Sequence, residues 1–227
     1  MSTETKVVSG IVLVTILIII GGIFAINKQS NKAASVTIKP DLVDRADAPR
    51  AGSSTKVIIT EFADFECPAC AVLSPELKRL LETDGDKFTL VYRHFPIHSH
   101  SYEAAAVALA AGEQGKFFQM SEVLFDKQSE WTPASANRTT LFEKYATQLG
   151  LDIAKFRVSV KDPKHEESVN KDRRDATAMG INSTPTLIIN GTEAVRGAIP
   201  YETLRKLVLE AYNATGTSAL TSASSTR

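Results

Sequence analysis

The first strong pattern in the chain is an uncharged apolar run over residues 7–26. At about 1.5 Å of rise per residue, a helix of this length spans roughly 30 Å, the thickness of the hydrocarbon core of a bilayer. The run is longer than the apolar region of a cleaved secretory signal, and the nearest cluster of small residues, 33–35, lies well beyond it. We therefore expect residues 1–26 to form a transmembrane anchor, with a cleaved signal as the alternative.

Polar segments without a sustained apolar period lie on both sides of the remaining domain. Residues 27–54 contain Pro40, Pro49 and alternating charges, which is typical of a linker. Residues 213–227 are small and hydroxylated and have little to bury, so we expect a disordered tail. The folded domain is then expected to cover residues 55–212.

The first part of this domain predicts a strand, a helix and a second strand. Residues 56–65 (KVIITEFADF) and 88–95 (FTLVYRHF) are rich in β-branched and aromatic residues and are short enough for buried strands. Between them, leucines recur at helical spacing after Pro68, so a helix should begin at Cys67. Pro75 should bend that helix. Together these elements form a βαβ unit.

The second part of the domain is helical before it returns to strand. Every signal over about residues 99–163 is helical, and a charged helix follows it. Strand propensity returns at residues 185–189, where Asn190-Gly191 predicts a hairpin turn into a paired strand, and an amphipathic helix closes the domain. The predicted fold class is α/β, with a helical subdomain inserted between the two halves of a small sheet.

Charge and size narrow the possible functions. The chain has 227 residues, and its 26 Lys and Arg balance its 26 Asp and Glu. Nucleic acid is therefore not an expected partner, because phosphate binders normally carry a basic excess. A domain spanning 55–212 is large enough to bury a core without a disulfide or a structural metal. The two cysteines of the chain need another explanation.

Cys67-Pro68-Ala69-Cys70 places two thiols at the start of the predicted helix. Unpaired backbone N–H groups and the helix dipole favour an anion there, so the pKa of Cys67 should lie below its ordinary value of about 8.5. Cys67 is the candidate nucleophile. Cys70, one turn further into the helix, is better buried and lies within disulfide reach, which suits a resolving cysteine.

Two further features bear on this chemistry. Thr184-Pro185 opens the hairpin strand, and a cis bond there would leave the backbone of Thr184 free to pair with an extended substrate. Glu61, in the strand before Cys67, should face the core beneath the helix, where its raised pKa would let it shuttle protons for Cys70. The alternative for Glu61 is a strand-end charge that reaches solvent.

A metal site is the competing interpretation of the two cysteines. Zinc needs four ligands and the chain has no second CxxC pair, so histidines would have to complete the set. His94, His98 and His100 follow the second predicted strand and are the candidates. A thioredoxin-like module that carries copper or zinc on these groups stays open at this point, and so does a role for the three histidines as ordinary loop residues.

The combination resembles one family. The CPxC at a helix start, the acid six residues before it, the helix proline and the TP pair before the hairpin are similar to the thioredoxin superfamily. The helical insertion narrows the resemblance to its DsbA-like thiol:disulfide oxidoreductases. The matching segments are EFADFECPAC, VYRHFPIHSHSYEAAAVALAAGEQGKFFQM and GINSTPTLIING, within about residues 55–212.

The resemblance implies a function. Cys67 would be the exposed nucleophile and Cys70 the buried cysteine, with Thr184-Pro185 as the cis-proline pair facing them and Glu61 as the buried acid. Catalysed disulfide exchange in reduced secreted proteins is implied, without a cofactor, and with reoxidation by a quinone-linked membrane partner. The domain would then lie outside the cell membrane. The lysines at 6, 28, 32 and 39 slightly favour the opposite orientation.

One residue departs from the family pattern. The best known oxidases of the family carry a histidine before the second cysteine, where it helps to stabilise the thiolate, whereas this chain has Ala69. The site is then expected to be less oxidising than theirs, and use as a reductase or an isomerase is the alternative to an oxidase.

Overall fold

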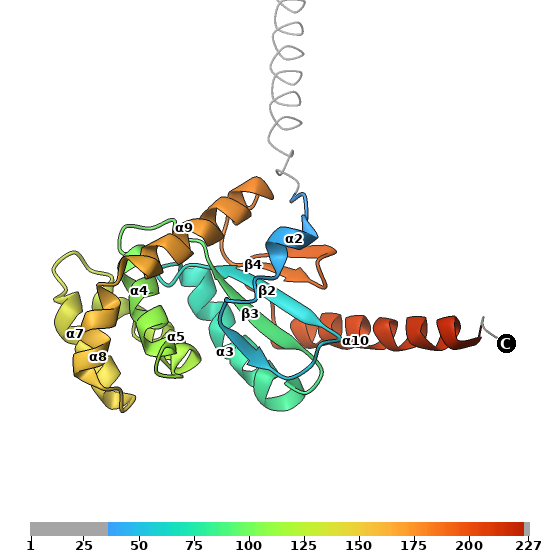
Figure 1. Ribbon diagram of the computed structural model, residues 1–227, viewed down its shortest axis with the longest axis horizontal. Coiled ribbons are helices and arrows are strands. Elements are labelled where there is room, and N and C mark those ends of the chain that lie inside the picture. The colour runs from blue at the N-terminus through green and yellow to red at the C-terminus, as the bar shows by residue number, and fades with distance from the viewer. Residues whose placement is uncertain (1–35, 225–227) are drawn as a thin grey trace, which may run out of the picture. The chain divides into compact units, whose positions relative to one another are not determined.

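The computed structural model describes residues 36–224, apart from the side chains of residue 193 and of residues 216–224. Its centre is a five-stranded sheet in the order β1-β3-β2-β4-β5. The strands are β1 (Arg50–Gly52), β2 (Ile58–Ala63), β3 (Thr89–His94), β4 (Thr186–Ile189) and β5 (Glu193–Arg196). Figure 1 shows helices packed around this sheet. The predicted α/β fold class is confirmed.

The predicted βαβ unit forms the middle of the sheet. Strands β2 and β3 pair in parallel, and helix α3 (Pro68–Asp84) connects them. The helix begins directly after Cys67, where Pro68 supplies a backbone already suited to the first helical turn. Pro75 lies inside the helix, as expected. Because β2 is central, its residues are buried on both faces, in accordance with its apolar sequence.

The hairpin after the helical block adds the last two strands. Strand β4 is antiparallel to β2 and to β5. Asn190 and Gly191, the predicted turn, both adopt positive φ angles, of 49° and 65°. Two consecutive positive φ angles are what a two-residue type I′ turn requires, and the Asn-Gly pair tolerates them. Because β4 pairs with β2, the Thr184-Pro185 pair, which directly precedes β4, lies at the end of the central strands.

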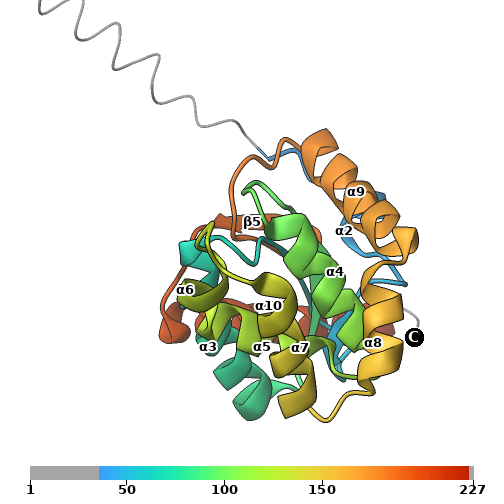
Figure 2. The ribbon, with the colours of Figure 1, turned by 90° about the vertical axis from the view of Figure 1, so that its left-hand side faces the viewer.

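The predicted helical subdomain lies between β3 and β4. It consists of α4 (Ser101–Gly112), α5 (Phe117–Asp126), α6 (Gln128–Trp131), α7 (Arg138–Gln148) and α8 (Ile153–Val160), and α9 (Pro163–Ala178) follows. Figure 2 shows these helices gathered on one side of the domain. Their shared core consists of alanines of α4 with large apolar residues, among them Phe117, Met120, Leu124, Trp131, Tyr145 and Phe156. This core continues into Cys67, Cys70 and Tyr92, so the subdomain packs directly against the cysteine pair.

A second core lies between the sheet and two helices, α3 and α10 (Tyr201–Ser224). The two helices lie side by side across the sheet (Figure 1). The leucines of α3 that predicted the helix from their spacing are the residues that it buries here. Apolar residues of the sheet and of α10 complete this core, among them Ile59, Leu90, Leu187, Leu204 and Val208.

The linker prediction for residues 27–54 is wrong for its second half. Helix α2 (Pro40–Val43) and strand β1 both belong to the folded domain, and β1 pairs antiparallel with β3. Polar contacts, which leave no apolar period in the sequence, attach this segment to the domain. Arg45 Nη1 donates to Asp172 Oδ1 at 2.7 Å, and Arg93 Nη1 donates to the carbonyl oxygens of Leu42 and Val43. Residues 27–35 lie outside the described residues.

The expected disordered tail also differs from the structure. Helix α10 does not end near Asn213 but continues to Ser224. The tail carries no proline, so the backbone hydrogen bonds of the helix can continue into it, and its alanines favour a helix.

The predicted transmembrane anchor, residues 1–26, lies outside the described residues. Among residues 36–224, none of the helices combines the length and the apolar character that crossing a bilayer requires.

Candidate active site

Cys67 occupies the N-cap position of α3. The first backbone N–H groups of a helix have no partner within it, so at this position they are available to the Cys67 sulfur. The backbone N–H of Cys67 donates to the carbonyl of Asp64 at 3.0 Å, which fixes the turn that leads into the helix. Cys67 is 7% exposed and Cys70 is 0% exposed, so only Cys67 is open to attack from solvent.

The surroundings of Cys67 favour its thiolate. Both cysteines are free thiols. The hydrogen bond from the Cys70 thiol, together with the backbone N–H groups of Cys70 and Ala69, lowers the pKa of Cys67 to about 5, against an opposing effect of burial. Ala69 therefore contributes through its backbone, although its side chain carries no charge. The predicted low pKa of the first cysteine agrees with this geometry.

Cys70 has the opposite electrostatic environment. Burial raises the pKa of its thiol far above the ordinary range, and the neighbouring Cys67 and Glu61 raise it further. At neutral pH the reduced pair therefore consists of a thiolate at Cys67 and a thiol at Cys70. A dithiol with one ionised and one protonated member is the arrangement required of a nucleophile and a resolving partner.

The Thr184-Pro185 peptide bond is cis, and it faces the cysteines. Cys67 Sγ lies 3.4 Å from the carbonyl oxygen of Thr184 and donates its S–H to that oxygen while it is a thiol. In the reduced protein this carbonyl is therefore in contact with Cys67, whereas the sequence suggested a backbone left free. The substrate-binding role of Thr184 and Pro185 stays a prediction.

Glu61 lies in the middle of β2, opposite Tyr92 of β3 and Leu187 of β4. It is 3% exposed, and burial raises its pKa to about 8. Its Oε1 atom has no hydrogen-bond partner among the described residues. The carboxyl group thus faces the core, as expected, and is not a solvated strand-end charge. A negative charge on Glu61 raises the pKa of Cys70, so the protonation states of the two groups depend on each other.

The three histidines proposed as metal ligands have other partners or environments. His98 Nδ1 lies 2.7 Å from Asp64 Oδ2, and His100 Nδ1 lies 3.0 Å from Glu66 Oε1. His94 is buried in an aromatic cluster, and burial lowers its pKa to about 3. Within residues 36–224, His, Cys, Asp and Glu side chains are not grouped in threes that could hold a metal ion.

These contacts belong to a set of hydrogen bonds between two loops that the sequence did not predict. Asp64 accepts hydrogen bonds from the backbone N–H groups of Glu66, Ile97 and His98, and Glu66 accepts one from His100. The loop after β3 is thereby tied to the loop that carries Cys67. The sequence does contain a signal for these contacts. Two acids two residues apart, at 64 and 66, pair with two histidines that are also two residues apart, at 98 and 100.

Two buried hydroxyl groups near Glu61 also escaped the sequence analysis. Tyr92 Oη and Ser121 Oγ are buried and have no hydrogen-bond partner within the described part of the chain. Tyr92 is recognisable in retrospect because it occupies the position opposite Glu61 in the neighbouring strand. Ser121 of α5 gave no signal, because its position depends on how the inserted helices pack.

Comparison with known proteins agrees with this site. The family model described as thioredoxin matches residues 50–210. The thiol-disulfide exchange protein alpha-DsbA2 from Wolbachia pipientis has a similar structure, with a TM-score of 0.65 and 27% identity over 75% of this chain and 90% of that chain. A thioredoxin-like oxidoreductase from Silicibacter pomeroyi has a TM-score of 0.65 and 26% identity over 77% of this chain and 98% of that chain.

The chain is also similar to parts of much longer proteins that are named as antiporters. The Na(+)/H(+) antiporter NhaA 1 of Mycolicibacterium vanbaalenii is 35% identical over 161 residues, which are 68% of this chain and 25% of the antiporter. This chain thus spans about a quarter of the length of that relative. The match to the family model covers most of the chain and includes both cysteines and Thr184-Pro185. The chain belongs to the thioredoxin family, and its fold is that of the DsbA-like thiol-disulfide exchange oxidoreductases.

Proposed function

We propose that this protein is a thiol:disulfide oxidoreductase that introduces disulfides into reduced secreted or surface proteins. The observation that supports this role most directly is the asymmetry of the cysteine pair. The pKa of Cys67 is lowered to about 5, and that of Cys70 is raised by burial. A thiolate that is stabilised in the reduced fold favours the reduced enzyme, and an enzyme that is stable when reduced is an oxidant of other thiols.

The reaction follows from the exposure of the two sulfurs. In the oxidised enzyme, a substrate thiolate attacks Cys67 Sγ, which is the accessible sulfur, and the bond between Cys67 and Cys70 breaks. Cys70 leaves as a thiolate and takes up a proton. A second substrate thiolate then attacks the substrate sulfur of the mixed disulfide, and Cys67 leaves as its stable thiolate. The substrate gains one disulfide, and two electrons pass to the enzyme.

Each part of the site has a role in this scheme. The low pKa of Cys67 makes it a good leaving group in the second step. Glu61 acts as the proton donor to Cys70, whose pKa its charge raises, and its own pKa near 8 suits exchange at neutral pH. Thr184 and Pro185 provide main-chain contacts to an extended substrate beside Cys67, which tolerates many sequences.

The proposal includes a location and a partner. Disulfide formation suits an oxidising compartment, so we place the domain on the extracytoplasmic side of the cell membrane, held there by the predicted anchor. A quinone-linked membrane protein would remove the two electrons and restore the disulfide. The antiport activity named for the curated relatives belongs to proteins of which this chain spans about a quarter, and we do not extend it to this chain.

A reductase or isomerase is the second candidate, and Ala69 is the observation that favours it. The side chain at this position carries no charge, so the thiolate of Cys67 is held by Cys70 and backbone N–H groups. The reduction potential separates the two functions. A reduction potential of about −120 mV supports the oxidase, and one of about −270 mV supports the reductase.

The direct test is oxidation of a reduced, unfolded protein by the oxidised full-length chain. We expect disulfides to appear in ribonuclease A with matching loss of the Cys67-Cys70 disulfide, and Cys67→Ser should abolish both. Labelling of intact cells with a membrane-impermeant thiol reagent, after a membrane-impermeant phosphine has reduced the Cys67-Cys70 disulfide, tests the location, with Cys67→Ser as the control for the labelled site. Failure of the wild-type chain to oxidise the substrate, or protection from the reagent, would contradict the corresponding part of the proposal.

A further inference from the structure

A small cavity lies beneath α3, between the sheet and α5. Its volume is about 40 Å³. Its buried polar groups are Glu61 of β2, Tyr92 of β3 and Ser121 of α5. Its more exposed polar groups are Ser74 and Lys78 of α3 and Glu122 of α5. The cavity therefore connects the buried acid of the site with a charged pair near the surface.

The buried polar groups of this cavity lack hydrogen-bond partners within residues 36–224. Glu61 Oε1, Tyr92 Oη and Ser121 Oγ are all buried and unpaired there. A buried polar atom left without a partner is unfavourable, so three of them around one cavity indicate that water bonds to them. A cavity needs roughly 10–15 Å³ to hold one water molecule, and this one exceeds that volume. It is both polar enough and large enough for water.

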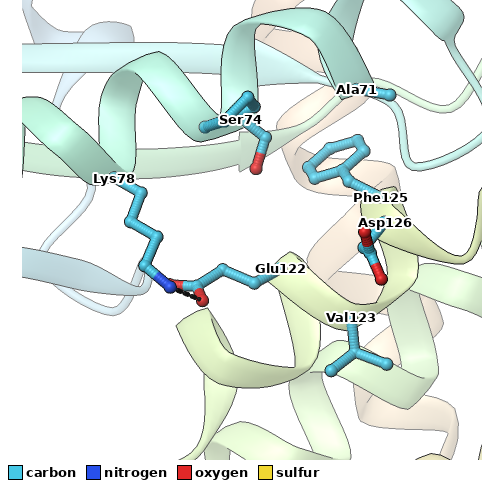
Figure 3. Close-up of a pocket in the computed structure, with 8 residues that line it drawn as sticks. Ala71, Ser74, Lys78, Glu122, Val123, Phe125 and Asp126 are labelled. Atoms are coloured by element: carbon cyan, nitrogen blue, oxygen red, sulfur yellow. Dashed lines mark hydrogen bonds and ion pairs between the residues drawn. The ribbon is translucent and has the colours of Figure 1, made fainter.

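A groove on the surface continues the path outward. It has a volume of about 380 Å³, lies between α3 and α5, and shares Ser74, Lys78, Glu122 and Phe125 with the cavity. Figure 3 shows Lys78 and Glu122 reaching toward each other across the groove. Lys78 Nζ lies 2.6 Å from Glu122 Oε2, and the two side chains are 49% and 39% exposed. This ion pair lines both the cavity and the groove, so it stands where they meet.

We propose that the cavity is a water-filled proton passage, which runs from Glu61 past Tyr92 and Ser121 to solvent beside the Lys78–Glu122 ion pair. The proposal rests on the proposed function and deepens it. It makes the inserted subdomain part of the catalytic machinery, because α5 supplies both Ser121 and Glu122.

The proton balance of disulfide exchange requires such a path. When Cys70 leaves as a thiolate, the Glu61 carboxyl group gives it one proton and becomes a carboxylate. Because its pKa is about 8, that carboxylate takes up a proton from solvent at neutral pH, although Glu61 is 3% exposed and Cys70 is 0% exposed. In the reverse reaction the same proton leaves by the same route. One proton therefore passes between Glu61 and solvent in either direction of exchange.

The titratable groups around Glu61 come from three elements. Cys70 and Lys78 lie on α3, Tyr92 on β3 and Glu122 on α5, while β4 presents Leu187 opposite Glu61. Burial raises the pKa of Tyr92 well above its usual value, so its hydroxyl stays protonated and can donate to water or to the carboxylate. Ser121 has a hydroxyl that both donates and accepts, which suits a relay position.

An isosteric pair of variants tests the passage. Ser121→Val replaces the hydroxyl with a methyl group and adds a second methyl, whereas Ser121→Thr adds the same volume and keeps the hydroxyl. The reduced protein is mixed with 5,5′-dithiobis(2-nitrobenzoate). Cys67 thiolate attacks it and releases the first thionitrobenzoate, and Cys70 then resolves the mixed disulfide and releases the second. Only the second step requires Cys70 to lose a proton through Glu61.

We expect Ser121→Val to slow the second release about tenfold or more near neutral pH, with the first release unchanged. Ser121→Thr should restore the second rate. In a Glu61→Gln background, Ser121→Val should cause no further slowing, because the group that feeds the passage is already gone. Equal second rates in all Ser121 variants, equal slowing in both, or slowing that persists in the Glu61→Gln background would each overturn the passage.

This reaction needs no protein substrate, so it separates the two proposals. A wild-type chain that fails to oxidise ribonuclease A but shows the hydroxyl-dependent second release contradicts the proposed oxidase function and supports the passage. A chain that oxidises ribonuclease A while Ser121→Val releases both equivalents at the wild-type rate supports the function and overturns the passage.

Discussion

Cys67 Sγ lies 3.4 Å from the carbonyl oxygen of Thr184, although the two residues are separated by 117 positions in the chain. The sheet explains this proximity. Strand β2, which leads into Cys67, pairs with β4, which follows Thr184-Pro185, and their antiparallel register brings the end of one strand to the start of the other. The helical subdomain lies between them in sequence but leaves this pairing intact. The nucleophile and the cis-proline pair therefore meet at one edge of the sheet.

The ionised state of Cys67 predicts how the reduction potential depends on pH. Between about pH 5.5 and 7.5 the reduced pair carries one proton, because Cys67 is a thiolate and Cys70 is a thiol. Reduction in this range takes up two electrons and one proton, so the potential should fall by about 30 mV per pH unit. Equilibration with glutathione buffers measures it. A fall of about 59 mV per unit across the range would mean that both thiols are protonated.

Burial of Glu61 predicts a change in stability with pH. Its pKa is about 8 in the folded protein against 4.5 for an ordinary glutamate, so between these values the folded protein holds a proton that the unfolded chain has lost. Glu61 should therefore contribute a fall of about 1.4 kcal/mol per pH unit to the free energy of unfolding as the pH rises through this window, against the opposite contribution of Cys67, whose pKa the fold lowers. Glu61→Gln removes this dependence, so its stability relative to wild type should increase from pH 5 to pH 8.

Urea unfolding of the reduced protein at several pH values makes this measurement. Glu82→Gln, at an exposed position of α3, is the matched control and should follow the wild-type profile. A constant difference between Glu61→Gln and wild type from pH 5 to pH 8 would contradict a raised pKa.

The buried ion pairs that hold the segment before β2 predict a large loss of stability. Asp172 accepts hydrogen bonds from Arg45 at 2.7 Å, from Arg93 at 2.5 Å and from the backbone of His94 at 2.9 Å. Asp172→Ala leaves each guanidinium group with one carboxylate that is more exposed, Asp47 for Arg45 and Asp175 for Arg93, which should lower the free energy of unfolding by about 3 kcal/mol.

Asp47→Ala is the control for this prediction, because Asp47 also pairs with Arg45 but its side chain is 67% exposed. Its loss should stay within about 1 kcal/mol. Equal losses for the two variants in urea unfolding would show that the buried network does not hold this segment in place.

The parts of the fold that the sequence predicted are those with local signals. β-Branched residues predict the strands around residues 58–63 and 89–94. Asn190-Gly191 predicts the hairpin turn, and Cys67-Pro68 predicts the start of the helix. Each signal acts over a few residues, so it can be read without knowing the tertiary structure.

The parts that were missed depend on contacts between distant segments. The sequence predicts a linker where strand β1 lies, because β1 is stabilised by distant parts of the chain. It pairs with β3, and Arg45 and Arg93 bind Asp172, which lies far away in the sequence. The same holds at the site. Glu61 was found from its spacing to Cys67, whereas Ser121 becomes a neighbour of Glu61 only through the packing of α5 against α3.

The most direct test of the account is the titration of Cys67 in the reduced protein. Thiolate absorbance at 240 nm, recorded from pH 3 to pH 10, should rise by one equivalent with a midpoint near pH 5, and Cys67→Ala should abolish this rise. The result that contradicts the account is a midpoint near pH 8.5, which is about the ordinary value for a cysteine thiol. In that case the fold would not stabilise the thiolate, and the reduced enzyme would have no advantage in accepting electrons from its substrates.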